Sequence, residues 1–217
     1  MKRILEPEAM DTAEEAEDYD GMNHSDPNRN FMQRLFELGA HGHLLDLGTG
    51  PAHLPIMIAK ARPDLRVTGI DLAHHMLRVA AHNIEASGLG DRIELKHGDA
   101  KALGLEAASF DTVYSNTILH HIPDPRPFLA EAKRMVKPGG TLLIRDLFRP
   151  PIDTRVDELV ELYAGEDSER QQNLFAASLR AAFTPEELRD LADQSGLTDC
   201  EVVIDTDRHM SLQRAAR

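Results

Sequence analysis

Three aspartates in the first half of the chain, Asp46, Asp71 and Asp99, each follow a short apolar stretch. Asp46 precedes Gly48 and Gly50, which let the backbone turn sharply and lie against a ligand with no Cβ in the way. A carboxylate beside such a loop repels a pyrophosphate and attracts a ligand that carries an ammonium group and a sulfonium. The three aspartates therefore indicate a site for a small cationic ligand, if the fold brings them together.

The spacing of these residues separates two kinds of nucleotide site. Asp71 lies about 20 residues beyond Gly48, the interval at which a carboxylate can accept hydrogen bonds from both hydroxyls of an adenosine ribose. A dinucleotide-binding loop would place a third glycine at position 53, where this chain has His53. We therefore expect an adenosine ligand without a pyrophosphate. A nicotinamide-dependent oxidoreductase is the alternative.

The aspartates can meet only at the end of a parallel sheet, because the carboxyl ends of parallel strands share one edge. From residue 42, short apolar segments alternate with amphipathic ones. The predicted strands are 43–47, 66–71, 92–97, 110–115 and 141–146, and the predicted helices between them are 53–62, 73–87 and 125–136. Strands and helices in this alternation predict an α/β fold, a parallel sheet with helices on both faces.

Helical patterns lie on both sides of this core. They cover residues 8–19 and 27–38 before it and 152–165 and 169–182 after it, and Thr184-Pro185-Glu186-Glu187 opens another helix with a capping box. Two strands at 199–205 and 209–213 end the chain. We therefore expect a single domain over 1–217, with a helical lid (1–40), a cofactor-binding core (41–146), a helical cap (147–195) and a C-terminal hairpin (196–217).

Composition narrows the class of protein. The formal net charge is −13, and residues 6–20 hold eight acids and no Lys or Arg, which disfavours a nucleic-acid partner. The single cysteine, Cys200, cannot form an internal disulfide, and no Cys/His spacing is typical of zinc, so we expect no metal. No apolar run reaches the roughly 18–20 residues of a membrane span, and the first residues do not read as a signal peptide. We expect a cytoplasmic monomer or homodimer without a membrane partner.

These residues resemble the motif series of class I S-adenosylmethionine-dependent methyltransferases. Asp46-Leu47-Gly48-Thr49-Gly50 is similar to the first motif, Asp71 to the ribose-binding acid, and Asp99-Ala100 to the acid at the adenine edge. Phe110-Asp111-Thr112-Val113-Tyr114-Ser115-Asn116 resembles the fourth motif, and Lys137-Pro138-Gly139-Gly140 the turn before the fifth strand. The resemblance covers residues 40–146. It departs at Ala52, where the family often has glycine.

The resemblance implies a mostly parallel, seven-stranded Rossmann-like sheet of order 3-2-1-4-5-7-6 with an antiparallel C-terminal hairpin. It also implies S-adenosyl-L-methionine as the cofactor and S-adenosyl-L-homocysteine as its product. In such enzymes the first acid and the glycine backbone hold the methionine end, the second acid the ribose and the third the adenine amine. The candidate cofactor-binding residues are Tyr19, Asp46, Gly48, Thr49, Gly50, Asp71, Leu72, Met76, Asp99, Ala100, Ser115 and Asn116.

The segment after the fourth predicted strand contains two adjacent histidines, His120 and His121. Small-molecule methyltransferases that resemble this chain often have a histidine here, and histidine can act as a general base at neutral pH. We expect one ring at most to face the acceptor, and a structural histidine is the alternative for each. The Asn/Asp-Pro-Pro-Tyr/Phe sequence, which marks many enzymes that methylate amino groups of bases or glutamine, does not follow this strand.

Four further residues are candidates for binding the acceptor. Arg145 and Arg149 follow or end the fifth predicted strand and can hold an acidic acceptor, Arg180 lies in the predicted cap, and His24 lies between the first two helices. Ordinary ion pairs are the alternative for the arginines. We expect methyl transfer to a small-molecule acceptor. A methyltransferase for RNA or protein, or a non-catalytic domain that binds S-adenosylmethionine, is the alternative.

Overall fold

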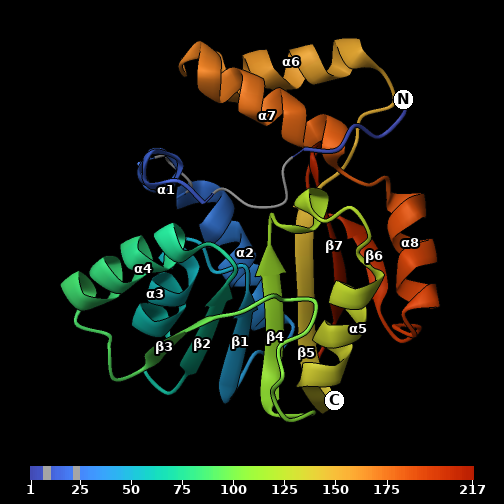
Figure 1. The fold of residues 1–217 in the computed structure, drawn as a ribbon. Helices are drawn as coiled ribbons and strands as arrows, with labels where there is room; N and C mark the ends of the chain where they lie inside the picture. The colour runs from blue at the N-terminus through green and yellow to red at the C-terminus, as the bar shows by residue number, and fades with distance from the viewer. Residues whose placement is uncertain (7–10, 22–24) are drawn as a thin grey trace.

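The computed structural model describes residues 1–6, 11–21 and 25–217. In this part of the chain seven strands form one sheet in the order β3-β2-β1-β4-β5-β7-β6 (Figure 1). The strands are β1 (His43–Leu47), β2 (Arg66–Asp71), β3 (Ile93–His97), β4 (Phe110–Asn116), β5 (Val136–Leu147), β6 (Glu201–Ile204) and β7 (His209–Arg214). Strands β1 to β5 pair in parallel, whereas β7 pairs antiparallel with both β5 and β6. The predicted sheet, its strand order and its antiparallel hairpin are confirmed.

Strand β5 is longer than the sequence predicts. It begins at Val136, which pairs with Phe110 before a register shift brings Thr141 opposite Thr112. Gly139 has a φ of 75° in this irregular stretch, a conformation that glycine adopts without the steric cost of a Cβ. Residues 137–140 therefore lead into the strand as a bulged part of it rather than as a separate turn.

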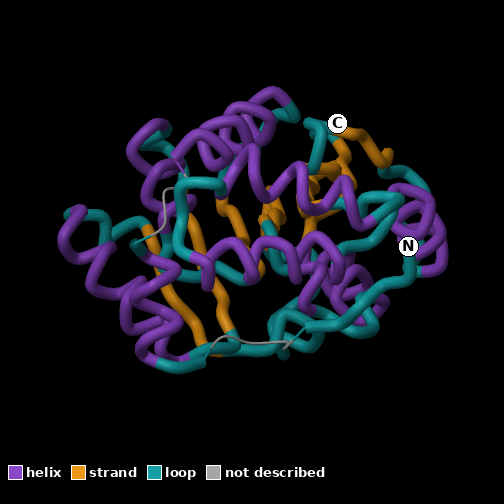
Figure 2. The backbone as a smooth tube through the Cα atoms, turned by 90° about the horizontal axis from the view of Figure 1, so that it is seen from above, coloured by secondary structure: helices purple, strands orange, loops and turns teal. Residues whose placement is uncertain are grey.

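Helices cover both faces of the sheet and one of its ends (Figures 1 and 2). They are α1 (Ala13–Asp20), α2 (Ser25–Glu37), α3 (His53–Ala61), α4 (His74–Ser87), α5 (Arg126–Met135), α6 (Asp153–Ala164), α7 (Glu169–Ala181) and α8 (Pro185–Gln194), with a 3₁₀ turn η1 (Leu119–His121). Capping boxes begin α7 at Ser168 and α8 at Thr184. The second of these boxes is the one that the sequence predicts.

The hydrophobic core lies in two layers, one on each face of the sheet. Neighbouring residues of a strand point to opposite faces. Leu142 therefore packs in the layer that contains Phe128 of α5 and Leu188 of α8, whereas Leu143 packs in the layer that contains Phe31 of α2. Because both faces are buried, the central strands are apolar along most of their length.

The carboxyl ends of the parallel strands point toward α1, α6 and α7, at the top of Figure 1. Helices α6 and α7 pack against each other through a buried cluster that includes Leu159 and Leu179. Residues 1–6 lie along this pair, where the Ile4 N–H donates to the carbonyl of Arg180 at 3.1 Å. In the described part of the predicted lid, α1 and residues 1–6 lie at this end, and α2 packs on the sheet with its first turn toward this end. No helix in the described ranges is long and apolar enough to span a membrane.

Candidate active site

A cavity of about 1170 Å³ lies at the carboxyl ends of the parallel strands. All of the candidate cofactor-binding residues line it except Ser115. The Ser115 side chain is buried in the sheet, and its hydroxyl donates to the carbonyl of Leu47 at 2.7 Å. Because side chains alternate along a strand, Asn116 reaches the cavity and Ser115 does not. The placement of Ser115 at the cofactor was wrong for this reason.

The glycine loop between β1 and α3 takes the tight path that its sequence predicts. Gly48 has a φ of 77°, and a Cβ at this position would lie 2.5 Å from Ile118, so only glycine fits. Gly50 has a φ of 52°. Ala52 follows with a φ of 63°, which explains why related chains often have glycine there, since a side chain is disfavoured in this conformation. The loop thus presents bare backbone to the cavity.

Asp46 is a buried carboxylate at the base of this loop. Its Oδ2 accepts a hydrogen bond from the Thr49 hydroxyl at 2.9 Å. Burial and, to a smaller extent, the nearby Asp71 raise the pKa of Asp46 to about 7, against the opposing effect of the Thr49 hydrogen bond. A raised pKa means that the groups around the buried carboxylate do not fully stabilise its negative charge. A ligand with a positive charge beside Asp46 would compensate it.

Asp71 and Asp99 end or follow the next two strands and are fixed by backbone hydrogen bonds. Asp71 accepts the N–H of Gly50 at 2.8 Å and that of Ala73 at 2.9 Å. Burial raises the pKa of Asp71, although these N–H groups oppose the rise. Asp99 accepts the N–H of Lys101 at 2.9 Å and forms an ion pair with its ammonium. The structure thus brings the three aspartates to one cavity, as the strand pattern predicts.

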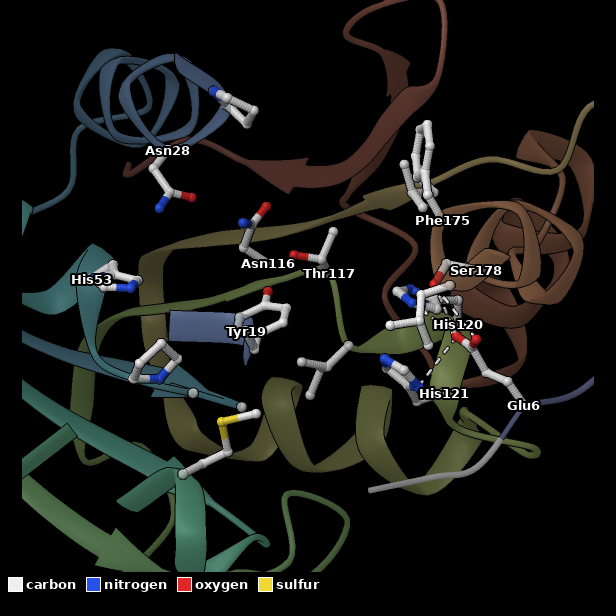
Figure 3. Close-up of a pocket in the computed structure, with 18 of the residues that line it drawn as sticks. Glu6, Tyr19, Asn28, His53, Asn116, Thr117, His120, His121, Phe175 and Ser178 are labelled. Carbon is white, nitrogen blue, oxygen red and sulfur yellow. Dashed lines mark hydrogen bonds and ion pairs between the residues drawn. The ribbon is translucent and has the colours of Figure 1, made fainter. Parts of the chain in front are cut away.

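Tyr19 of α1 reaches into the same cavity and lies beside the glycine loop (Figure 3). A Cβ on Gly50 would be 3.9 Å from its ring. Burial raises the pKa of Tyr19, and a hydrogen bond with Thr117 opposes this. Thr117 itself has a φ of 61°, which is rare for a β-branched residue and concentrates at functional sites. Helix α1 therefore closes one side of the cavity.

At the other end of the cavity two carboxylates, Asp146 and Glu6, hold His120, and Figure 3 shows Glu6 beside the ring. Its Nδ1 lies 2.6 Å from Asp146 Oδ1, its backbone N–H donates to Asp146 Oδ2 at 2.9 Å, and its Nε2 lies 3.2 Å from Glu6 Oε1. Burial lowers the pKa of His120, but Asp146 and Glu6 outweigh that effect and raise it to about 9. Asp146 orients this ring in the way a carboxylate orients the histidine of a catalytic triad.

His121 also faces the cavity, so the prediction that one ring at most would do so was wrong. Its Nδ1 lies 3.2 Å from Glu6 Oε1, and the rings of His120 and His121 pack with centroids 4.2 Å apart. Adjacent side chains diverge along a strand, but η1 is a helical turn, where consecutive side chains can share a cavity. Glu6 was not predicted as a site residue, because it lies in an acidic run that resembles a solvated surface.

The arginine candidates for the acceptor site serve the fold instead. Arg145 is buried, donates to the Pro27 carbonyl at 3.0 Å and does not line the cavity. Arg149 donates to the Ala182 carbonyl at 2.7 Å and to the Glu187 carboxylate at 2.6 Å. Arg180 forms a salt bridge with an aspartate of α6. None of the three guanidinium groups lines the cavity, so the structure does not bring the predicted arginines to the acceptor end of the site. The remaining candidate, His24, lies outside the described residues.

Comparison with known proteins agrees with this geometry. Residues 45–144 match the family model for a methyltransferase domain. The chain is 30% identical over 164 residues to the O-methyltransferase rstn1 of Aspergillus nomiae, covering 71% of this chain and 70% of that protein. It is 29% identical over 163 residues to 27-O-demethylrifamycin SV methyltransferase of Amycolatopsis mediterranei, covering 73% of this chain and 60% of that protein. The chain thus spans little more than half of some relatives.

Solved structures show the same fold. A SAM-dependent methyltransferase from Aquifex aeolicus superposes with a TM-score of 0.71 at 17% identity, covering 96% of this chain and 100% of the other. Phosphoethanolamine N-methyltransferase 2 of Haemonchus contortus, in complex with S-adenosyl-L-methionine, superposes with a TM-score of 0.64 at 25% identity, covering 82% of this chain and 39% of the other.

The chain belongs to the class I S-adenosylmethionine-dependent methyltransferase family. The cofactor of that family carries an ammonium and a sulfonium, and the cavity offers a buried, poorly compensated carboxylate at Asp46 beside glycine backbone. The chemistry of this end of the cavity therefore fits a cationic nucleoside. No pyrophosphate-binding pattern competes with it, because His53 occupies the position of the third glycine.

Proposed function

We propose that this protein transfers the methyl group of S-adenosylmethionine to a small-molecule acceptor bound in the same cavity. One observation carries the proposal: a single cavity joins Asp46 and Asp71 at one end to His120, His121 and Glu6 at the other. The names of two relatives support a small acceptor, because one acts on 27-O-demethylrifamycin SV and another on demethylmenaquinone.

The aspartates would divide the cofactor between them. The ammonium group of its methionine end would bind beside Asp46, and the ribose hydroxyls would bind Asp71, whose carboxylate is already oriented by two backbone N–H groups. The adenine amine would bind Asp99. Tyr19 would cover the nucleoside from α1. The cofactor supplies an activated methyl group on a sulfonium, so the protein has mainly to align the two reactants, which can remove about 7–11 kcal/mol of the barrier.

The histidine cluster would act on the acceptor. When the acceptor begins as a hydroxyl, the bond from its oxygen to the methyl carbon forms as the bond from that carbon to sulfur breaks, and the hydroxyl proton must leave. His121 is the candidate to take this proton, a role that contributes roughly 10²–10⁴-fold in rate when a base is needed. Asp146 and Glu6 raise the pKa of His120 to about 9, so His120 would already hold its proton at neutral pH and would position the turn that carries His121.

The acceptor is proposed to be free in the cytoplasm, with the protein acting as a monomer or homodimer. The net charge of −13 supports a small acceptor over a nucleic acid, because phosphate backbones are held by basic surfaces. Cys200, the single cysteine, has a thiol whose pKa is raised by burial to about 11, so it is poorly reactive and suits a reducing compartment.

Two measurements test the proposal. Calorimetry should show that S-adenosylmethionine binds at micromolar concentration and that Asp71→Asn weakens binding at least tenfold. The variant Asp64→Asn, whose carboxylate forms an exposed ion pair with Arg62, is the matched control and should bind as the wild type does. Incubation with methyl-labelled cofactor and a metabolite extract should then yield a labelled small molecule. Wild-type affinity in Asp71→Asn would refute the placement of the ribose.

A further inference from the structure

Three side chains at the acceptor end of the cavity form a cluster with the composition of a metal site. The ligand atoms of Glu6, His120 and His121 all lie within 4.8 Å of one another. Glu6 Oε1 is 3.2 Å from His120 Nε2 and 3.2 Å from His121 Nδ1 (Figure 3). The three side chains are 10%, 4% and 14% exposed. Burial on this scale distinguishes the cluster from the loose acidic groups of a protein surface.

We propose that Glu6, His120 and His121 bind a divalent transition-metal ion. Two imidazoles and one carboxylate are the ligand set of several catalytic zinc sites and of many iron sites. Ligand atoms that bind a tetrahedral ion at about 2.0–2.1 Å lie roughly 3.4 Å from one another. The two separations from Glu6 Oε1 are close to this value. The two histidine nitrogens lie within 4.8 Å of each other, and their approach to the same spacing would complete the geometry.

The groups behind the cluster orient its ligands. Asp146 is almost completely buried and binds both the backbone N–H and the Nδ1 of His120. A carboxylate in this place holds the proton on Nδ1, so an ion that displaces the proton from Nε2 would find the lone pair of Nε2 directed toward it beside Glu6. Metal-ligating histidines usually have such a carboxylate or carbonyl behind them. Ser178 of α7 donates to Glu6 Oε1 at 3.2 Å and orients the third ligand.

The N-terminal segment holds Glu6 against the histidines through Arg3. The guanidinium of Arg3 donates to the carbonyls of His120 at 2.9 Å and Ile122 at 3.0 Å, and it lies over the Phe183 ring at 3.7 Å. Arg3 is thus bonded to the very turn that carries both histidine ligands. The segment and the turn are fixed relative to each other, so the carboxylate is placed before any ion binds.

Three protein ligands leave a coordination position open, which distinguishes catalytic from structural metal sites. The cluster lines the cavity that also contains the proposed cofactor residues, so the open position would face the acceptor. A hydroxyl bound to the ion becomes more acidic. Because the histidines would then bind the ion, the proton of the hydroxyl would pass to solvent instead of to His121. The oxygen would form its bond to the methyl carbon as the bond from that carbon to sulfur breaks. This catalytic role, for an acceptor with a hydroxyl group, rests on the proposed function. The metal site itself does not.

Metal binding can be measured on the full chain without cofactor or acceptor. The protein is treated with EDTA, freed of the chelator and titrated with Zn²⁺ by calorimetry, and then with Co²⁺ by visible absorption. We expect one ion per chain at micromolar affinity or tighter. Glu6→Gln and His121→Ala should each weaken binding at least tenfold. His82→Ala removes an exposed histidine of α4 and should leave binding unchanged.

Two outcomes would overturn the inference. If the wild type did not bind Zn²⁺, the three side chains would form a hydrogen-bonded cluster and not a metal site. If Glu6→Gln bound Zn²⁺ as well as the wild type does, the ion would be bound elsewhere, by surface histidines. Thermal unfolding in EDTA shows whether the variants fold, and Glu6→Gln keeps the size of the side chain. A wild type that binds S-adenosylmethionine but no Zn²⁺ would contradict this inference and leave the proposed function intact.

Discussion

The backbone N–H of Gly50 donates to the carboxylate of Asp71 at 2.8 Å, so the end of β2 holds the glycine loop that follows β1. The same carboxylate accepts the N–H of Ala73 at the start of α4. One side chain therefore joins two loops at the proposed cofactor site. It follows that substitution of Asp71 affects both the stability of the fold and the affinity for the cofactor.

Asp71→Ala should lower the free energy of unfolding by about 1–3 kcal/mol, because two partly buried N–H groups lose their acceptor. Urea denaturation without cofactor measures this loss. Asp64→Ala, which removes only an exposed ion pair, should leave the free energy of unfolding close to that of the wild type. Equal stability of the Asp71 variant and the wild type would show that water replaces the carboxylate at no cost.

Cofactor affinity should depend on pH through Asp46. Burial raises the pKa of this residue to about 7, so it is mostly neutral at pH 6 and half ionised at pH 7. The ammonium of the cofactor favours the ionised form, so binding should tighten about fivefold between these values, as expected for one group with that pKa. Calorimetry at pH 6 and 7 measures this, and Asp46→Asn should remove the dependence. If the Asp46→Asn variant kept the pH dependence of cofactor binding, another titrating group would be its cause.

Thr117→Gly should stabilise the fold and weaken cofactor binding. A left-handed conformation costs a residue with a side chain about 1–2 kcal/mol, and glycine gives back roughly 0.5–1 kcal/mol through its greater entropy when unfolded. The control is Ala108→Gly, at an exposed position with a φ of 52°. It should gain similar stability but keep wild-type affinity, because only Thr117 contacts Tyr19 at the cavity. A destabilised Thr117→Gly would contradict the strain argument.

His209 should make the fold sensitive to acid. Burial, together with the nearby Arg145 and Arg208, lowers the pKa of His209 to about 3. The unfolded chain takes up the proton near pH 6.5. Stability should therefore fall as pH drops from about 6.5 toward 3, by roughly 1 kcal/mol per pH unit in this range. Unfolding of His209→Gln between pH 7 and 5 should show a shallower slope, whereas the exposed His82→Gln should keep the wild-type slope.

Arg3→Ala should release the N-terminal segment from the histidine turn. Four backbone carbonyls accept hydrogen bonds from this guanidinium, and the loss of such partly buried bonds costs about 1–3 kcal/mol. Arg3→Lys should not restore the stability, because an ammonium cannot span the same acceptors. Lys2→Ala, at the exposed neighbouring position, is the control. Full stability in Arg3→Lys would show that charge alone holds the segment.

The cofactor end of the site was predictable because it depends on local sequence. Asp46, Asp71 and Asp99 end or follow apolar segments, and parallel strands bring such positions to one edge whatever the details of packing. Ser115 was misplaced because the pattern shows where a strand ends but not which of its last two side chains faces the cavity. Strand β5 was expected to begin at 141 because residues 137–140 resemble a turn, whereas pairing across a register shift makes them part of a strand that begins at Val136.

The acceptor end was not predictable in this way. Glu6 lies more than a hundred residues from His120 in the chain, and no local pattern indicates that they meet. Arg145 and Arg149 lie where an acceptor-binding residue could lie, yet both point into the protein and bond to carbonyls there. Whether a charged side chain serves the site or the fold depends on which distant groups satisfy it.

By itself the sequence determined the order of strands and helices, the glycine loop and the acids at the strand ends, because each follows from hydrophobic period and backbone conformation within a few residues. Only the tertiary structure decided that Glu6, His120, His121 and Asp146 form one buried cluster and that the arginines do not belong to it. These contacts form between residues that are far apart in the sequence. They depend on how the N-terminal segment, the turn after β4 and the α6–α7 pair pack against one another.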